Sequence, residues 1–254
     1  MNLDELSATP DLHTDPVVAG RYDRVHADRF ADDELGPSVA LLAELAGDGP
    51  AVEFAIGTGR VAVPLAATGI SVMGMDVSTS MLEHLRAKPE AIGIRAVEGD
   101  MTTTRLTDEA TLAYLVFNTI TNLRTQDLQV ACFQNAAAHL APGGRFLVEV
   151  QVPPLANLPT GETIRPFSIT EQHLGFEEFV DPAAQWSISH HVHFDDAGGA
   201  SRVSALFRYV WPSELDLMAR LAGMQLEHRW AGWNREPFDG DSERHVSVWR
   251  KPVA

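Results

Sequence analysis

The stretch VEFAIGTGRVA at residues 52–62 decides the fold. Its first half has the length and composition of a buried strand, and Gly57 and Gly59 then turn the chain into a segment typical of a helix. Glycine lets the backbone approach a ligand closely, and the first N–H groups of a helix have no partner within it. We therefore expect a ligand-binding turn here, in the crevice that open α/β sheets use.

The same alternation of strand and helix continues along the chain. Five short apolar runs have the length of strands: 51–56, 70–75, 93–97, 112–117 and 145–150. Three helical patterns alternate with them: 59–68, 79–87 and 126–140. Such alternation predicts right-handed crossovers and a parallel sheet covered on both faces, to which further strands at 224–230 and 245–250 add.

The residues before the first strand predict two helices. Asp15-Pro16 offers an N-cap and a proline at the first helical position, so we expect a helix over 17–30. Gly36-Pro37 should break it, and the segment SVALLAELAG at 38–47 should form a second helix.

A different pattern begins after Val150. Residues 151–184 contain five prolines and no clear period, which predicts mainly loop with at most a short strand. Two alternating segments at 186–194 and 202–211 flank the turn DDAGG and predict a β-hairpin. We expect one apolar, aromatic sheet face, made by Trp186, Ile188, His190, Val192 and Phe194 with Val203, Ala205, Phe207, Tyr209 and Trp211. Ser213 should then cap a helix that ends at Gly223.

These patterns predict an α/β fold, a doubly wound, mostly parallel sheet with an antiparallel β-flap insertion. The expected parts are N-terminal helices covering the site (1–48), a ligand-binding core (49–150), a loop and hairpin insertion (151–211) and the end of the core sheet (212–254).

Composition excludes several classes of function. The formal net charge is −16 and the chain has only two lysines, which argues against nucleic acid because phosphate binding needs clustered basic residues. No apolar run approaches the roughly 18 residues that span a bilayer, so we expect no membrane partner. The first fifteen residues lack the pattern of a signal peptide, and the single cysteine cannot form an internal disulfide. A cytoplasmic protein fits best.

The glycine turn alone leaves two ligands open. Gly57-x-Gly59-x-x-Ala62 with Asp76 downstream satisfies the loose dinucleotide fingerprint. Glu53, however, lies four residues before Gly57, where a carboxylate would repel a pyrophosphate but would suit a cofactor that carries an ammonium and a sulfonium. Asp100, after the third expected strand, can accept a hydrogen bond from an adenine amino group.

Five linked motifs carry a family resemblance. They are E-x-A-x-G-T-G-R from Glu53, G-M-D-V-S-x-S-M-L from Gly74, E-G-D-M from Glu98, L-V-F-N-T from Leu115 and L-x-P-G-G-R-F from Leu140. In order and spacing, residues 50–150 resemble class I S-adenosylmethionine-dependent methyltransferases. One departure is Ala55, where many members carry glycine. The resemblance implies S-adenosylmethionine as cofactor and methyl transfer as the activity.

The resemblance also implies a role for each matching position. Ala55, Gly57, Thr58 and Gly59 would line the methionine part of the cofactor, with Glu53 supporting the loop and the ammonium end. Asp76 would accept both ribose hydroxyls. The adenine would meet Val77, Met81, Asp100 and Met101, and Phe117 and Asn118 would close the site beside the sulfonium.

Two residues are candidates for chemistry. Tyr22 matches the family's N-terminal helix, which often folds over the cofactor and presents a tyrosine. His190 is the only ionisable group among the apolar side chains of its strand face, which makes it a candidate base; a hydrogen-bonded core histidine is the alternative. His191 and His193 share the polar face, but no cysteine or nearby acid completes a site, so the sequence predicts no metal.

The methyl acceptor is not specified by the sequence. The flap position is similar to that of small-molecule enzymes such as amino-sugar N-methyltransferases, which favours a small acceptor in bacterial secondary metabolism. A protein that binds the cofactor without transferring methyl, as a regulator or cyclase-like catalyst, is the alternative, with a nicotinamide-dependent oxidoreductase third. An apolar flap also leaves a homodimer open.

Overall fold

The computed structural model describes residues 16–20, 22–25, 32–195 and 198–253 and contains two sheets. The larger sheet has seven strands in the order β10-β11-β5-β4-β1-β2-β3. Their bounds are β1 (Ala51–Phe54), β2 (Val72–Asp76), β3 (Arg95–Glu98), β4 (Ala110–Leu115), β5 (Leu140–Gln151), β10 (Gln225–Trp230) and β11 (Arg244–Arg250).

Six of these strands run in one direction, and β11 is antiparallel to both of its neighbours. From β1 the chain moves outward through β2 and β3, and it then returns to the other side of β1 to form β4 and β5. The strand order therefore reverses between β1 and β4, which is the position where open α/β sheets bind ligands. The sheet is therefore doubly wound and mostly parallel, as the sequence predicted.

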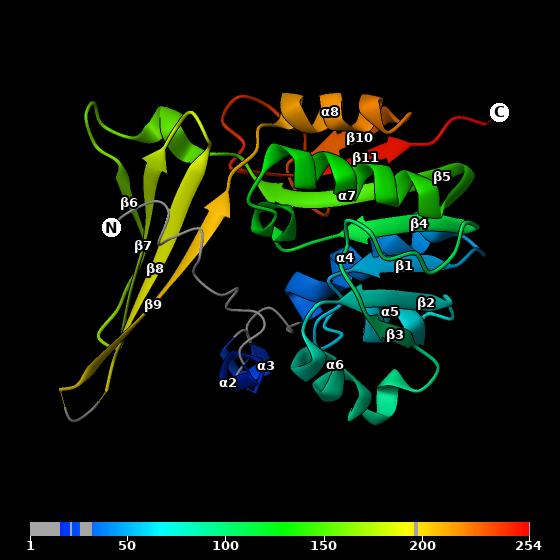
Figure 1. The fold of residues 1–254 in the computed structure, drawn as a ribbon, viewed down its shortest axis with the longest axis horizontal. Helices are drawn as coiled ribbons and strands as arrows, with labels where there is room; N and C mark the ends of the chain where they lie inside the picture. Colours follow the sequence, from blue (N-terminus) through cyan, green and yellow to red (C-terminus); the bar gives the residue numbers. More distant parts are fainter. Residues whose placement is uncertain (1–15, 21, 26–31, 196–197, 254) are drawn as a thin grey trace.

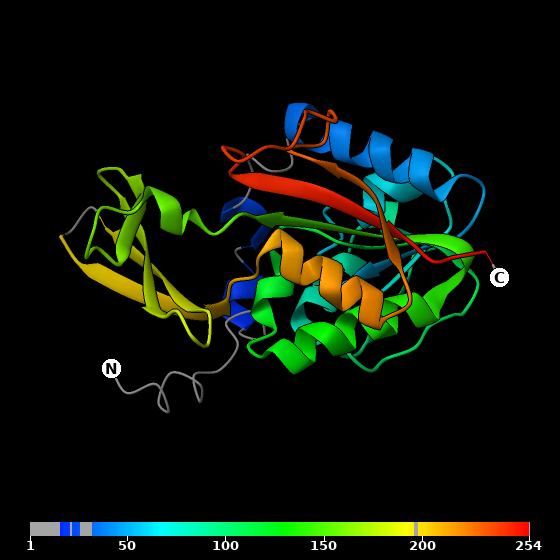
Figure 2. The same ribbon diagram turned by 90° about the horizontal axis from the view of Figure 1, so that it is seen from above.

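Helices cover both faces of the large sheet (Figure 1; Figure 2). Their bounds are α4 (Asp32–Ala46), α5 (Ala62–Ala67), α6 (Thr79–Arg86), α7 (Gln126–His139) and α8 (Pro212–Leu221). Figure 2 shows α4 on one side of the sheet and α7 and α8 on the other. None of these helices, nor any other in the described part of the chain, has the length and apolar composition that crossing a bilayer requires.

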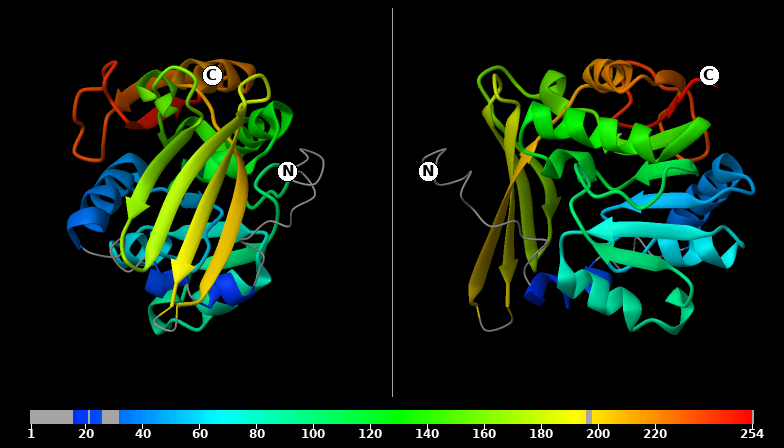
Figure 3. Two further views of the ribbon diagram at one scale, coloured as in Figure 1. Left: turned by 90° about the vertical axis from the view of Figure 1, so that its left-hand side faces the viewer. Right: turned by 45° about the vertical axis from the view of Figure 1, so that its right-hand side comes forward.

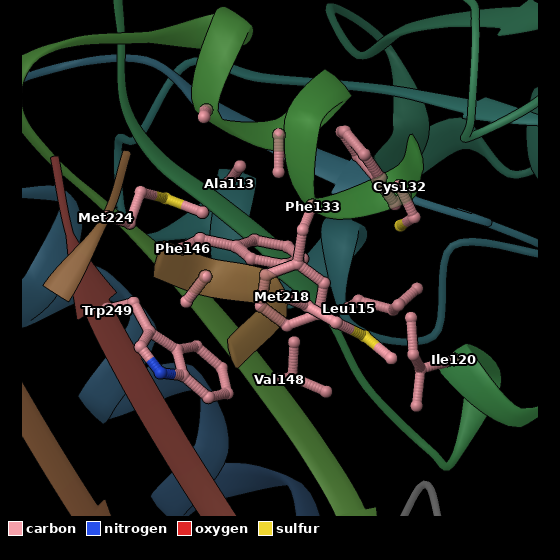
Figure 4. Close-up of a cluster of buried hydrophobic side chains, with 14 of the residues drawn as sticks. Ala113, Leu115, Ile120, Cys132, Phe133, Phe146, Val148, Met218, Met224 and Trp249 are labelled. Atoms are coloured by element: carbon pink, nitrogen blue, oxygen red, sulfur yellow. The ribbon is translucent and has the colours of Figure 1, made fainter. Parts of the chain in front are cut away.

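The core beneath α7 and α8 is rich in aromatic rings (Figure 4). Phe133 of α7 meets Phe146 of β5 and Trp249 of β11 edge to face, with ring centroids 5.0 and 5.2 Å apart. All three side chains are fully buried. Burying aromatic surface on this scale supplies much of the hydrophobic stabilisation and holds the strand ends in place.

The N-terminal helices differ from the prediction. The expected helix over 17–30 is represented by α2 (Pro16–Ala19) and α3 (Tyr22–Val25), and residues 26–30 lie outside the described residues. Gly36-Pro37 does not break a helix, because α4 begins at Asp32 and contains Pro37. A proline here costs one backbone hydrogen bond, and the burial of Leu41, Leu42 and Leu45 outweighs that cost.

The insertion after β5 is a four-stranded antiparallel sheet, where the sequence predicted loop and one hairpin. Its strands are β6 (Ile164–Ile169), β7 (His173–Asp181), β8 (Trp186–Phe194) and β9 (Ala200–Arg208), in that order. They stand side by side across one end of the large sheet (Figure 3). The prediction was wrong because it took proline as evidence against a strand. Pro166 lies on the edge strand β6, next to an irregularity in its pairing with β7, where a proline is tolerated.

The expected single apolar face of the hairpin is wrong. Ile188 pairs with Leu206 and His190 with Ser204, whereas Phe207 pairs with Ser187. Directly paired residues share a face, so the two apolar sets lie on opposite faces of the sheet. The register depends on the length of the connection between Phe194 and Ala200, and alternation within each strand does not reveal it. The following helix also begins at Pro212, one residue before the expected cap.

Candidate active site

The glycine turn connects β1 to α5 through left-handed backbone. Ala55, Gly57 and Gly59 have φ values of 54°, 55° and 80°. A Cβ at Gly59 would lie 2.3 Å from Cδ1 of Leu85, so only glycine fits there. A Cβ at Gly57 would meet nothing within 4 Å, so this residue borders open space. Ala55 adopts a conformation that glycine adopts at lower cost, which explains physically why glycine is favoured at this position.

Asp76 ends β2 and binds two backbone amides. Its Oδ2 accepts a hydrogen bond from Gly57 N at 2.8 Å, and its Oδ1 accepts one from Ser78 N at 2.8 Å. Ser78 in turn caps α6 by accepting from Met81 N. The carboxylate is almost fully buried, so it is fixed in position between the glycine turn and the start of α6.

Glu53 is buried in the middle of the site. It lies opposite Tyr114 across β1 and β4, and the Tyr114 hydroxyl donates to its Oε2 at 3.0 Å. Burial raises the pKa of Glu53 to about 8, although the Tyr114 bond and the charge of Arg60 act in the opposite direction. The carboxyl group is therefore largely protonated at neutral pH in the free protein, and a nearby cation would favour its ionised form.

Asp100 lies beyond β3, next to the end of β2. The preceding residue, Gly99, donates its N–H to Asp76 O at 2.9 Å. Oδ1 of Asp100 accepts from both the backbone N and the hydroxyl of Thr102, and the side chain is exposed. Asn135 of α7 donates to the carbonyl of Met101 and fixes this turn to the helix layer. Of the other predicted adenine neighbours, Val77 is about half exposed and Met81 is buried.

The end of β4 forms the opposite wall. Phe117 and Asn118 are consecutive residues with φ values of 60° and 58°, a conformation that costs energy for residues other than glycine. Phe117 N donates to Glu149 Oε2 at 2.8 Å, and Asn118 Oδ1 accepts from Gln151 N at 2.7 Å. These two contacts tie the turn to the end of β5 and offset part of the strain.

Two small pockets open on either side of this turn and share Phe117 and Glu149. One is lined also by Ser38, Arg60, Val61, Val116 and Trp233. The other is lined also by Asn118, Val150, Gln151 and Arg244. The Arg60 guanidinium lies 5.1 Å from the centre of the Phe117 ring and so connects the glycine turn with the β4 end. The sequence prediction assigned no role to Arg60, although it ends the glycine motif. It missed Glu149 and Arg244 because only the pairing of β5 with β11 brings these two together.

The N-terminal segment is fixed to the glycine turn by Asp23. Its Oδ1 accepts from the Thr58 hydroxyl at 2.5 Å, and its Oδ2 pairs with Lys88 Nζ at 2.6 Å. Lys88 also donates to the carbonyl of Thr58 at 2.8 Å. Neither Asp23 nor Lys88 was among the predicted residues, because their contacts cross from α3 to the segment after α6.

Tyr22 lies next to Asp23 and close to the predicted cofactor residues. Burial raises its pKa, and the charges that act on it include those of Arg60, Glu53 and Asp76. Tyr22 is therefore near enough to the glycine turn and to the end of β2 for their charges to act on its hydroxyl.

His190 is the one predicted site residue that the described structure places outside this group, on β8 of the smaller sheet. Its Nδ1 is 2.8 Å from Ser204 Oγ, and its Nε2 is 3.3 Å from Glu178 Oε2. The ring stacks on Phe176 at 4.7 Å and is almost fully buried. Both ring nitrogens therefore have partners on neighbouring strands.

Comparisons with known proteins find a matching family model and similar structures. Residues 51–144 match the family model described as a methyltransferase domain, and no curated protein gives a significant match. The structure of the CcbJ methyltransferase from Streptomyces caelestis is 36% identical, with a TM-score of 0.77, over 85% of this chain and 94% of that one.

Two further structures resemble the chain at lower identity. One is CalS10 from Micromonospora echinaspora, an amino pentose methyltransferase involved in calicheamicin biosynthesis, solved with S-adenosylmethionine bound. It has 20% identity and a TM-score of 0.71 over 91% of this chain and 96% of that one. The sugar N-methyltransferase KedS8 from Streptoalloteichus has 17% identity and a TM-score of 0.64 over 89% and 92%. At these identities the likeness concerns the fold.

Proposed function

Because this chain belongs to the S-adenosylmethionine-dependent methyltransferases, we propose that it methylates an amine-bearing small molecule in bacterial secondary metabolism. The observation that carries the proposal is the Asp76–Gly57 hydrogen bond, which sets an acid and a glycine turn at the strand-order reversal. This arrangement supports a cofactor site at the ends of β1 and β2.

The residues of the crevice fit S-adenosylmethionine. Gly57 borders open space, so a ligand can contact its backbone. Asp76 would hold the ribose hydroxyls, and Asp100 the adenine amino group. Glu53 would ionise beside the cationic methionine end. When bound, the cofactor supplies a methyl group on a sulfonium, which needs little further activation. The protein contributes mainly positioning and the exclusion of water.

The acceptor would bind where the two pockets meet, beside Phe117 and Glu149. A carboxylate at this position suits an amine. Two of the three named structures are an amino pentose methyltransferase and a sugar N-methyltransferase. The four-stranded sheet stands across the same end of the molecule (Figure 1). Arg165 of β6 pairs with Glu243 at 3.2 Å, and Glu243 O accepts from Val152 N just after β5, so this sheet adjoins the proposed acceptor site.

Of the two catalytic candidates, Tyr22 has the better support. The charges of Glu53 and Asp76 act on its hydroxyl, which would orient the reacting groups and exclude water. His190 is engaged through both nitrogens, which supports a structural role. An amine that is neutral at the working pH needs no base in the transfer step, so the proposed acceptor is consistent with this assignment.

The experiment is product formation. The protein is incubated with S-adenosylmethionine and a panel of amino sugars, other small amines and matched hydroxyl compounds, and S-adenosylhomocysteine is measured. We expect it to appear only with an amine, in equal amount to the methylated product. Formation with hydroxyl compounds alone would contradict the amine assignment. Tight cofactor binding without transfer to any compound would favour the regulator or cyclase-like alternative.

We also propose that the chain self-associates through the four-stranded sheet, where Ile164 and Ile169 of the edge strand β6 are exposed. Light scattering of the eluting protein tests this: a mass of two chains is expected, and a monomer at every concentration would contradict it.

A further inference from the structure

Three histidines meet near the far end of the four-stranded sheet. His191 and His193 alternate on β8, and His173 on the adjacent strand pairs directly with His193. Their side chains therefore share one face. One nitrogen from each residue can be chosen so that all three lie within 4.8 Å of one another. The sequence showed only the two histidines of β8, because β7 was read as loop.

In His173 and in His191, one ring nitrogen lies within hydrogen-bond distance of a serine hydroxyl, and the other ring nitrogen faces the neighbouring histidine. His173 Nδ1 is 2.8 Å from Ser168 Oγ, and His191 Nε2 is 3.2 Å from Ser189 Oγ. The remaining nitrogens, His173 Nε2 and His191 Nδ1, are hydrogen-bonded to each other at 3.0 Å, and a bound ion would take the place of the shared proton. Metal-binding histidines commonly have their second nitrogen fixed by such a hydrogen bond, which sets the tautomer and the ring orientation.

The spacing suits a tetrahedral ion. Zinc–nitrogen bonds of about 2.0–2.1 Å place two ligand nitrogens roughly 3.3 Å apart, close to the separation of His173 and His191. His193 is exposed and stacks on His173 with ring centroids 4.8 Å apart. One nitrogen of His193 lies within 4.8 Å of the chosen nitrogens of the other two, so it would have to move closer to complete the ligand set.

An aromatic ring shields one side of the cluster. The Phe167 ring lies 5.3 Å from that of His191 and 6.4 Å from that of His173. It fits there because residue 175 is glycine, at which a Cβ would approach the ring to 2.3 Å. The Phe167 side chain is itself half exposed, so the cluster is open to an ion from solvent on its other side.

We propose that His173, His191 and His193 form a binding site for one divalent transition-metal ion, with Zn²⁺ as the best-fitting ion. Three neutral imidazoles are a known zinc ligand set, and they leave a fourth position for water or another ligand. The ion would join β7 to β8 and so stabilise this end of the sheet. The site is separate from the residues assigned to S-adenosylmethionine, and the proposal does not depend on the methyl acceptor.

To test the site, untagged protein is first treated with a chelator and then titrated with zinc. Calorimetry should show one ion per chain with a dissociation constant in the micromolar range or tighter. Co²⁺ should give the visible absorption of a tetrahedral complex. Zinc should also raise the melting temperature. The absence of saturable binding in the parent protein would overturn the proposal.

His173→Ala distinguishes a three-ligand site from the two histidines of β8. We expect at least tenfold weaker zinc binding in His173→Ala and in His193→Ala, and His193 is exposed enough for its substitution to preserve folding. The control is His84→Ala, which removes an exposed histidine of α6 and should bind as the parent does. Parent-like affinity in both His173→Ala and His193→Ala would show that the ion binds elsewhere and would overturn the site.

Discussion

Asp76 Oδ2 accepts a hydrogen bond from Gly57 N at 2.8 Å, and this contact joins the last residue of β2 to the glycine turn that follows β1. Asp76 can therefore serve both the fold of the turn and the binding of a ligand. It holds the glycine turn in its left-handed conformation before any ligand arrives, and it presents a charged acceptor at the crevice. An acid fixed in this way loses little entropy when a ribose binds.

Asp76→Ala should therefore weaken binding of S-adenosylmethionine by about 10- to 150-fold, which corresponds to the loss of a charged hydrogen-bond partner worth about 1.5–3 kcal/mol. Calorimetric titration measures the change. Asp108→Ala, which removes an exposed acid after β3, is the control and should bind as the parent does. Equal affinity in all three proteins would remove Asp76 from the site.

The Glu53 carboxyl should make the free protein less stable as pH rises. Its pKa is about 8 in the folded protein and about 4.5 when unperturbed. At a pH between these two pKa values, Glu53 is ionised in the unfolded chain but protonated in the folded chain. The free energy of unfolding therefore falls by up to about 1.4 kcal/mol per pH unit. Glu53→Gln removes this slope.

Urea unfolding without cofactor at pH 5, 6.5 and 8 measures this effect. The advantage of Glu53→Gln over the parent should grow with pH, while Glu90→Gln, an exposed control, should follow the parent. Parallel stability curves for Glu53→Gln and the parent would mean that Glu53 ionises normally.

Sequence patterns predicted the parts of the molecule that depend on local order. The glycine turn, Asp76 and the β4 end follow from strand–helix alternation, because the carboxyl ends of parallel strands meet at one edge. The cross-strand register was not predictable: His173 lies beside His193 only through the pairing of β7 with β8. The ion pair between Lys88 and Asp23 was not predictable either, because it is a tertiary contact between distant segments and leaves no periodic pattern in the sequence.

Lys88→Gln should loosen the N-terminal segment. The substitution removes the ion pair with Asp23 and the hydrogen bond to Thr58 O. Partly exposed ion pairs contribute up to about 1 kcal/mol, so we expect cofactor release to be accelerated by up to about fivefold. Stopped-flow displacement measures the rate. Arg220→Gln, an exposed charge on α8, should leave it unchanged. Unaltered release in Lys88→Gln would show that the Asp23 contacts do not retain the cofactor.

Tyr22→Phe should lower turnover at saturating cofactor by about tenfold or less. The hydroxyl orients and desolvates the reacting groups, whereas an obligatory base contributes about 10²- to 10⁴-fold. Steady-state rates with an identified acceptor provide the measurement. A loss above about a thousandfold would assign Tyr22 a direct part in proton transfer.

His190→Gln should lower the free energy of unfolding and leave turnover largely unchanged. Its ring nitrogens contact Ser204 and Glu178 inside the sheet, and breaking buried hydrogen bonds costs about 1–3 kcal/mol. Ser204→Ala should reproduce part of the stability loss, as measured by urea unfolding. If turnover falls more than about a hundredfold in His190→Gln while Ser204→Ala remains active, His190 acts as the base.

The central claim is that the crevice formed by Glu53, Gly57 and Asp76 binds a cationic methyl donor rather than a dinucleotide. Calorimetric titration of the parent protein with S-adenosylmethionine, S-adenosylhomocysteine and reduced nicotinamide dinucleotide tests it most directly. The account predicts saturable binding of the first two, with one molecule per chain, and no binding of the dinucleotide. Saturable dinucleotide binding without binding of S-adenosylmethionine would contradict it.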